Sequence, residues 1–449
     1  MAAEQLFSID DLFFSTTDPK GVIRSGNRVF ERVAGYTEQE LLGRPHNVVR
    51  HPDMPRAVFQ LLWDEIGAGR PLAAYVKNLA KDGSSYWVMA CLVPVEDGYL
   101  SVRLKPTSDV RDVVEGLYGE MRALELSIEG GDGKARKRAI EASTALLGER
   151  LGDLGYPDYR TFMQAALAGE MLARERARSR APVEQLSGDE RLEAVAANVQ
   201  ETLEFLDGLF SNLTGYVDLN RSLAEKSGFI GDLAASIRLY SFNALIAAMR
   251  FGGKGAALGA VADIMGSLAV KINAILHGLT ESIGETVGLL DGLVFDISLC
   301  KLQAEMTVEF ARELLREGER SDPKHEARVQ ADITMLTRSV HREVDGLLES
   351  LAQLEGRLHE IWSGSDALAA QLDVLRAVQM NGRIEAAALD GADHVAALFA
   401  RIREHLDEAT RRTDDVVALS RTAVRGTRAD AAVRDRLDRL DDLAELIAA

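Results

Sequence analysis

The sequence predicts an α+β module with an antiparallel sheet and short helices at its N-terminus, followed by a mostly α region of long antiparallel helices. Aromatic, proline-containing and β-branched stretches lie mainly before about residue 107, and Ala, Leu, Glu and Arg dominate after it. Turn pairs such as Asp82-Gly83 and Asp97-Gly98 separate strand-like runs in the first hundred residues. Apolar residues then recur every seven positions, which is typical of coiled-coil packing.

The N-terminal segment alternates short strands with helices. "LFFSTTD" and "VIRSGN" flank a turn at Asp18, Pro19 and Gly21, which predicts a hairpin. Two short helical pieces follow, and Thr37 with Glu40 forms a capping box for the second. "PRAVFQLLWDEIGAG" has helical apolar spacing, and "AAYVKNLA", "SSYWVMACLVPV" and "GYLSVRLKP" read as three further strands. We expect one face of this sheet to be solvated, and the other to curl around helices and enclose a pocket.

Charge and composition narrow the class of protein. The 449 residues include 52 Lys and Arg against 70 Asp and Glu, a net charge of −18 with no basic block, so nucleic acid and anionic membranes are unfavourable partners. The two cysteines, Cys91 and Cys300, cannot form a disulfide framework and suit a reducing cytosol. We see neither a signal peptide nor about 18 uncharged apolar residues in a row, and expect a soluble cytoplasmic protein.

The N-terminal module resembles the PAS domain of bacterial aerotaxis receptors. The resemblance rests on "GYTEQELLGRPHNVVRHPDMPRAVFQLLW", "VKN", "KDG", "YWV" and "GYLSVRLKPT", and it extends almost without gaps from Phe13 to Thr107. In that family the pocket holds FAD, whose redox state reports oxygen or electron transport. Carried over position by position, the resemblance implies that six residues bind the cofactor: Asn27, Arg50, His51, Asp53, Asn78 and Trp87.

The chemistry of these residues suits a flavin, although alternatives stay open. Carboxamides both donate and accept hydrogen bonds along the ring edge, and arginine can meet a pyrophosphate. Met89 and Cys91 stand where the family has Arg and Asn, which predicts one lost hydrogen bond to the flavin. His46 either bonds locally beside Pro45 or, with His51, offers an axial ligand to haem, the rival cofactor. An empty PAS fold that only binds partners is the third reading. Phe59 and Trp63, on the longer helix, are read as core residues and not as cofactor contacts.

Residues 109–183 read as a helical connector. Breaks at "EGGDGK" and "LGYPDY" divide it into three helices. We find no catalytic constellation in it, and we expect a mechanical role that couples the N-terminal module, residues 10–107, to the region that follows.

The remaining sequence reads as one helical hairpin written twice. One apolar ladder has a seven-residue period at Val195, Thr202, Leu209, Tyr216, Leu223, Ile230 and Ile237. A second ladder lies 138 residues later, at Ile333, Val340, Leu347, Leu354, Ile361, Leu368 and Leu375. The same offset superimposes "NALIAAMRFGG" on "NGRIEAAALDG", and it is not a multiple of seven. We therefore infer an internal duplication.

The two copies predict a long antiparallel four-helix coiled-coil bundle made of tandem hairpins. The first spans 187–320, opens with a capping box at Ser187 and Glu190, and bends near 252–255. The second spans 323–447 and bends near 390–393, with Asp322-Pro323 between the copies. Because one chain supplies four arms, we expect the fragment from Ser187 onward to be a monomer that imitates a receptor dimer.

The first bend resembles the signalling tip of methyl-accepting chemotaxis proteins. "NALIAAMRFGGKG" keeps Asn243 and Arg250 of the family pattern, and the second copy keeps Asn381 and Glu385. The resemblance implies contacts of these four residues with other chemoreceptors, the histidine kinase or its coupling protein. Several charges of the pattern are lost, with Ala247 in place of a glutamate, and no paired methylation sites follow residue 107. Ordinary control of the kinase is therefore doubtful.

These observations predict a sensor that signals by protein contact. We expect a PAS-based redox or oxygen sensor whose helical bundle changes packing, and not an enzyme, since no nucleophile–base pair, phosphate loop or metal cluster is recognisable. A cofactor-free scaffold and a haem-binding gas sensor are the alternatives, and a flavin oxidoreductase is a weaker one. Glycines crowd 252–292, which indicates either a soft helix or close helix approach.

Overall fold

The computed structural model describes residues 4–129, 133–178, 190–211, 251–317, 323–389 and 393–426, with isolated positions between 212 and 250. Two compact units share the chain. The first unit comprises residues 1–210, 294–347 and 431–449, and the second comprises 211–293 and 348–430. Two long helices, α9 (Ala256–Glu317) and α10 (Pro323–Ala387), contribute to both units.

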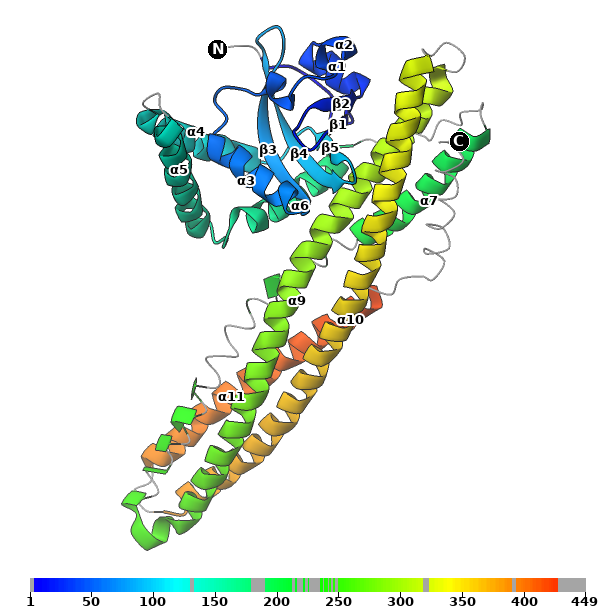
Figure 1. The fold of residues 1–449 in the computed structure, drawn as a ribbon. Coiled ribbons are helices and arrows are strands. Elements are labelled where there is room, and N and C mark those ends of the chain that lie inside the picture. Colours follow the sequence, from blue (N-terminus) through cyan, green and yellow to red (C-terminus); the bar gives the residue numbers. More distant parts are fainter. Residues whose placement is uncertain are drawn as a thin grey trace. The chain divides into compact units, whose positions relative to one another are not determined.

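An antiparallel five-stranded sheet in the order β2-β1-β5-β4-β3 forms the centre of the first unit (Figure 1). The hairpin predicted around Gly21 and the three-stranded meander are both confirmed, and β1 pairs with β5 to join them. The strands are β1 (Phe13–Thr17), β2 (Ile23–Gly26), β3 (Leu72–Leu79), β4 (Ser85–Val95) and β5 (Gly98–Leu104).

Short helices connect β2 to β3. They are α1 (Arg28–Ala34), α2 (Glu38–Leu41), the 3₁₀ turn η1 (His46–Val49) and α3 (Arg56–Gly67). The side chain of Asn27 caps α1 by accepting the N–H of Phe30. The predicted capping box of α2 is confirmed, with the N–H of Thr37 donating to Glu40 Oε2 at 3.1 Å.

The expectation of one solvated sheet face is wrong, because helices cover that face. The three predicted connector helices are α4 (Val110–Ile128), α5 (Gly133–Asp153) and α6 (Tyr159–Ala177). Tyr75 of β3 donates to Glu170 of α6 at 2.7 Å, and the ring of Trp87 lies 6.3 Å from that of Tyr118 in α4. The alternating pattern of a half-exposed sheet is accordingly absent from β1, β4 and β5, whose residues are largely buried on both faces, whereas the edge strand β2 alternates.

The ends of the long helices also pack in the first unit, beside α7 (Glu190–Ser211). Phe310 of α9 meets Phe14 of β1 edge to face, with ring centroids 4.9 Å apart. Asp332 of α10 accepts a hydrogen bond of 2.9 Å from Ser25 in β2. Lys301 of α9 is buried and pairs with Asp207 of α7 at 2.7 Å.

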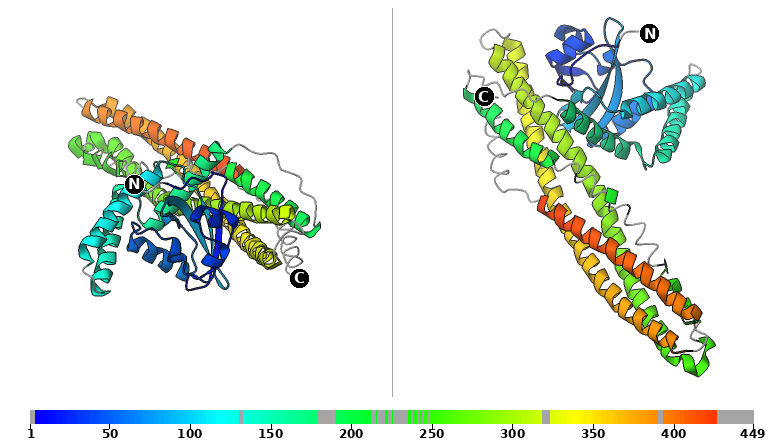
Figure 2. Two further views of the ribbon diagram at one scale, coloured as in Figure 1. Left: turned by 90° about the horizontal axis from the view of Figure 1, so that it is seen from above. Right: turned by 180° about the vertical axis from the view of Figure 1, so that it is seen from behind.

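In the second unit, α9 and α10 pack against each other and α11 (Asp393–Gly426) lies beside α10, side by side in Figure 2. Gln379 of α10 donates to the carbonyl of Phe399 at 2.6 Å, and Arg376 pairs with Asp407. The sequence ladder in α10 is confirmed, since each of its members is at most 2% exposed: Ile333, Val340, Leu347, Leu354, Ile361, Leu368 and Leu375.

The first predicted bend is a 3₁₀ turn, η2 (Gly252–Gly255), whereas residues 390–392 of the second bend lie outside the described residues. The same holds for Ser187 and for Tyr216, Leu223, Ile230 and Ile237 of the first ladder, although its described members Thr202 and Leu209 are buried. Phe251 beside η2 stacks on His394 of α11 at 6.2 Å, which joins the two copies near their bends. The predicted domain boundaries and the duplication stay predictions.

Glycines in α9 and α10 differ in what surrounds them. A Cβ added at Gly266, Gly278 or Gly284 of α9 would meet no atom of the described residues within 4 Å. In α10, by contrast, a Cβ at Gly364 would lie 2.8 Å from Leu279, and one at Gly382 would overlap the ring of Phe399. Close approach therefore occurs in α10, whereas the α9 glycines make no such contact with the described residues, and each lowers the helix propensity of α9.

Over Ala256–Leu315, α9 is long and apolar enough to span a membrane by length and composition, with a mean hydropathy of 1.5 in its most apolar window. The helix also carries buried polar side chains, including Ser298 and Gln303, and its last turns pack on the sheet through Phe310. Of the most apolar window, 39% is buried inside the structure.

Candidate functional site

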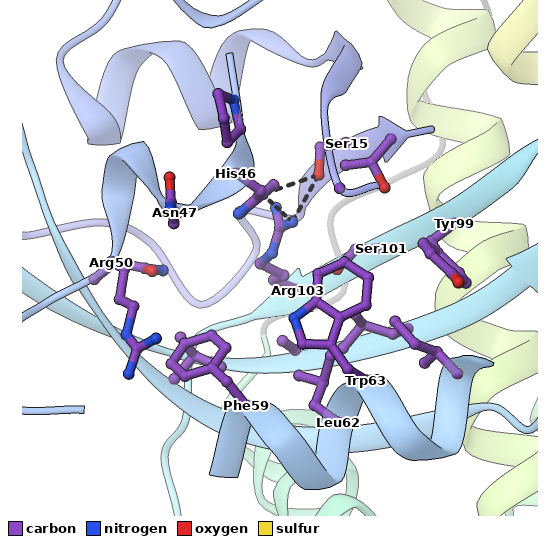
Figure 3. Close-up of a pocket in the computed structure, with 18 of the residues that line it drawn as sticks. Ser15, His46, Asn47, Arg50, Phe59, Leu62, Trp63, Tyr99, Ser101 and Arg103 are labelled. Carbon is purple, nitrogen blue, oxygen red and sulfur yellow. Dashed lines mark hydrogen bonds between the residues drawn. The ribbon is translucent and has the colours of Figure 1, made fainter. Parts of the chain in front are cut away.

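A cavity of about 240 Å³ lies in the first unit between the sheet and the helices that connect β2 to β3 (Figure 3). Its apolar wall comes from one side of α3 and the facing strands, because α3 turns its side chains at spacings of three and four toward the sheet. The residues of this wall are Phe59, Leu62, Trp63, Ile66, Val76, Ala90 and Leu92.

Polar groups at the opposite side of the cavity form one connected cluster of Ser15, His46 and Arg103 (Figure 3). Arg103 Nη2 donates to Ser15 Oγ at 2.6 Å and to His46 Nε2 at 2.7 Å. The imidazole also stacks on the ring of Phe30, with centroids 5.6 Å apart. Residues from β1, β5 and η1 are thereby held together behind the cavity.

His46 is neutral in this arrangement. A guanidinium can only donate, so Nε2 of His46 accepts and the ring proton lies on Nδ1. Burial, and then the nearby charge of Arg103, lower the pKa of His46 to about 3. The side chain of His46 does not bond locally beside Pro45, as one reading of the sequence had it, but contacts Ser15 of β1 and Arg103 of β5 at the cavity.

Arg103 is a buried cation without a carboxylate partner among the described residues. It is 5% exposed, and burial lowers its pKa to about 10, so it stays charged at neutral pH. Its Nη1 atom and the hydroxyl of Ser101, two residues earlier on the same face of β5, are buried and have no hydrogen-bond partner in the described part of the chain. Buried unpaired donors are rare in proteins, and these two line a cavity.

Two of the six residues carried over from the aerotaxis receptors line the cavity, Arg50 and Asn78. They form an isolated β-bridge, so the segment after η1 is attached along the edge of β3. The guanidinium of Arg50 lies 4.0 Å from the centroid of the Phe59 ring and donates to the carbonyl of Met54 at 3.0 Å. The arginine of the "HNVVRHPDMP" segment thus joins the cavity to α3.

The other four carried-over residues do not line the cavity. His51 and Asp53 lie with Lys77, whose side chain points to the opposite face of β3 from Asn78, and Lys77 Nζ is 3.2 Å from Asp53. Trp87 belongs to the helix-covered sheet face, and Asn27 is used in capping α1 and in holding the backbone of Phe14 at 3.0 Å. Their role at a cofactor stays a prediction.

Sequence reasoning missed the β5 residues and assigned two α3 residues to the core alone. Tyr99, Ser101 and Arg103 alternate along "GYLSVRL" and share the cavity face, a pattern that the strand period could have revealed. Phe59 and Trp63 also line the cavity. Met89 and Cys91 belong to the other face of β4, so their departure from the family sequence does not alter the cavity wall.

The histidines are poorly placed to ligate haem. Nε2 of His46 is already taken by Arg103, and Nδ1 of His51 accepts the N–H of Asp53 at 3.2 Å, away from the cavity. Among the described residues, no group of three or more His, Cys, Asp or Glu side chains could hold a metal ion.

The four residues expected at the bundle tips occupy helices of the second unit. Asn243, Arg250 and Asn381 are exposed and Glu385 is partly buried. Exposed apolar side chains stand beside them. Phe242 and Ile246 are 61% and 40% exposed, and the residues 138 positions later, Met380 and Ile384, are 52% and 59% exposed. We call these four side chains the apolar tip pairs.

Comparison with known proteins identifies the N-terminal module. A family model described as the PAS fold matches residues 24–101. The aerotaxis receptor of Escherichia coli K12 is 44% identical over 119 residues, which are 25% of this chain and 24% of the receptor. The biofilm dispersion protein BdlA of Pseudomonas aeruginosa PAO1 is 24% identical over 160 residues, 33% of this chain and 37% of that protein. The chain thus matches about a quarter to a third of these relatives' length.

Among solved structures, the PAS domain of a protein from Colwellia psychrerythraea is 24% identical, with a TM-score of 0.19, over 21% of this chain and 85% of that chain. The N-terminal module is therefore a PAS domain homologous to that of the aerotaxis receptor, and it is followed by a mostly helical region. The resemblance of that region to chemoreceptor tips stays a prediction.

Proposed function

We propose that the PAS domain binds a flavin, FAD, and that the chain is a redox- or oxygen-sensing signal transducer of chemoreceptor type. The observation that carries this proposal is the presence of two buried donors at the cavity, Arg103 Nη1 and the Ser101 hydroxyl, that have no hydrogen-bond partner among the described residues. A bound flavin would supply reversible electron transfer. Homology to the PAS domain of the aerotaxis receptor gives independent support.

The donor set fits the polar edge of a flavin ring. Arg103 and Ser101 can donate to ring oxygens and nitrogens, and the carboxamide of Asn78 can donate and accept. Among the described residues no carboxylate offsets the positive charge of Arg103, so this charge favours a ligand that carries or gains negative charge. The aromatic rings of Phe59 and Trp63 provide flat apolar surface.

The size of the cavity limits what it encloses. Its volume of about 240 Å³ is below the roughly 300–1,000 Å³ of sites that bury a whole drug-sized ligand. One ring system suits it better than an entire dinucleotide, whose phosphates would remain near the rim. Lys20 and Arg50 are the cations among the lining residues that could meet them.

The visible spectrum of the purified full chain tests the cofactor. We expect flavin absorption near about 450 nm, either as isolated or after addition of FAD. Arg103→Met should weaken FAD binding by at least about tenfold, because a charge-assisted hydrogen bond is lost. Arg32→Met, which removes a half-exposed arginine paired with Asp11, is the control and should bind as the unaltered chain does. A chain that stays colourless with FAD would refute the proposal.

For the output, we propose protein contact through the bundle tips. Large apolar side chains exposed at equivalent positions of two repeats are unfavourable in water unless a partner covers them. A chemoreceptor-type partner, such as a receptor tip or the coupling protein of the chemotaxis kinase, fits the sequence resemblance around Asn243 and Asn381. Phe242→Glu with Met380→Glu should abolish binding to such purified partners, whereas the exposed Val270→Glu should not.

We further propose that the chain works without catalysis and in the cytoplasm, with α9 as a core helix. Burial raises the pKa of Cys91 to about 12 and that of Cys300 well above its usual value, so neither thiol is a ready nucleophile. Sedimentation of the fragment from residue 187 onward tests the predicted monomeric bundle. An obligate dimer would contradict the idea that one chain imitates a receptor dimer.

A further inference from the structure

Helix α3, the apolar wall of the cavity, lacks a cap of its own. The residue before it is Pro55, whose side chain has no acceptor for the first free N–H groups of the helix. The N–H groups of Arg56 and Ala57 donate instead to the two carboxylate oxygens of Glu125, at 2.9 and 3.0 Å. Glu125 belongs to α4, so the start of α3 is completed by the connector.

Two neighbours on the same face of α4 strengthen this contact. Arg122 Nε donates to the carbonyl of Pro52 at 3.1 Å, and Arg122 Nη1 lies 3.2 Å from Glu125. Glu129 pairs with Arg56 Nε at 2.5 Å. We call Arg122, Glu125 and Glu129 the α4 clamp. Its central carboxylate is 0% exposed, so its hydrogen bonds are not easily replaced by water.

The segment held by the clamp is continuous with the cavity. Phe59, Leu62 and Trp63 line the cavity from the turns of α3 that follow the cap. On the other side of the cap, the Met54 carbonyl accepts from Arg50, which also lines the cavity. A helix of twelve residues moves largely as a rigid rod, so a shift of its cavity face also moves the two N–H groups on Glu125.

Another carboxylate in the first unit provides a contrast. Glu170 of α6 accepts from Tyr75 and from the N–H groups of Thr107 and Ser108, at the start of α4. None of these three donors lines the cavity. Glu170 anchors α4 to the sheet, whereas Glu125 joins α4 to the element that a ligand would touch.

We propose that Glu125 is a positioning residue through which occupancy of the cavity reaches the connector helix α4. Ligand contact with α3 alters the geometry of the cap, and the clamp transfers this change to α4. The linkage is reciprocal. If the ligand stabilises the contact between α4 and α3 by some factor, then loss of that contact lowers the affinity for the ligand by the same factor. The inference rests on the proposed function only in taking FAD as the occupant.

Hydrogen exchange of the full chain, with and without FAD, tests the proposal. Without FAD, Glu125→Gln should speed exchange at the amides of Arg56 and Ala57 about tenfold, because a charge-assisted cap is lost. With FAD, the unaltered chain should show slower exchange in α3 and also in α4. Glu125→Gln should keep the slowing in α3 and lose it in α4.

The matched control is Glu120→Gln, which removes the same charge from α4 but contacts Arg150 of α5 and not α3. It should behave as the unaltered chain. Equal FAD-induced protection of α4 in both variants overturns the proposal, as does an unchanged exchange rate at Arg56 and Ala57 in Glu125→Gln. If FAD does not bind at all, the proposed function fails, and the exchange measured without FAD still decides whether Glu125 forms the cap.

Discussion

Replacement of His46 by glutamine should reduce the loss of folding stability that the PAS domain undergoes at acid pH. Glutamine can still accept from Arg103 through its carbonyl oxygen, but it does not titrate. The folded pKa of His46, about 3, is depressed below its usual 6.5. Between these values the unfolded chain binds a proton at this residue and the folded chain does not. Stability therefore falls as the pH falls.

The size of the effect follows from the pKa difference. The shift from 6.5 to about 3 corresponds to about 5 kcal/mol when both states are fully titrated. At pH 5 the unfolded histidine is almost fully protonated and the folded one is not, which makes the contribution about 2 kcal/mol relative to pH 7.5. That amount is a substantial part of the stability of a small domain.

Urea unfolding at pH 7.5 and pH 5, followed by tryptophan fluorescence, measures this contribution, since Trp63 and Trp87 both belong to the PAS domain. Other buried groups titrate alike in the two proteins, so the difference between them isolates His46. The unaltered chain should lose about 2 kcal/mol more than His46→Gln over this range. An equal loss in both would refute the buried neutral imidazole.

Three further perturbations follow from the same reasoning. Gly284→Ala should raise the free energy of unfolding by up to about 1 kcal/mol. Gly382→Ala should lower it, because the added Cβ would overlap the ring of Phe399. Thermal melts of the two variants measure both changes. Burial raises the pKa of Asp332 from 3.8 to about 7, so stability is lost as the pH rises from about 4 to about 7, and Asp332→Asn should remove that loss in urea titrations. Arg103→Met should lower the reduction potential of bound flavin in spectroelectrochemical titration, and an unchanged potential contradicts the role of its charge.

Much of the fold was predictable because local signals agree with it. The Asp-Gly turns, the capping box at Thr37 and Glu40 and the α10 ladder each act over a few residues, and each appears where the sequence places it. The solvated sheet face was predicted wrongly because its cover comes from helices outside the N-terminal segment, α4 and α6 of the connector and the more distant α9. Apolar strands such as "SSYWVMACLVPV" already carried the signal of burial on both faces.

The candidate site was predictable only in part. Arg50 and Asn78 follow from the family resemblance, but Arg103 and Ser101 come from a strand that read as simple β-structure. What distinguishes them is the absence of partners for buried donors, and pairing is a property of the folded chain alone. The same holds for Glu125. In the sequence it is one acidic residue of an amphipathic helix, and only the structure shows its contact with α3.

Because Glu125 of α4 caps α3, the choice of fragment boundaries affects the PAS domain. A fragment that stops at residue 107, where the sequence resemblance ends, would discard Glu125 and leave two main-chain donors to water. It would also remove the helices that contact Tyr75 and Trp87, and the newly exposed apolar face of the sheet would favour aggregation. A fragment for crystallisation or spectroscopy should therefore extend at least through α6, because α4 and α6 supply contacts to the PAS domain that lie beyond the homology region.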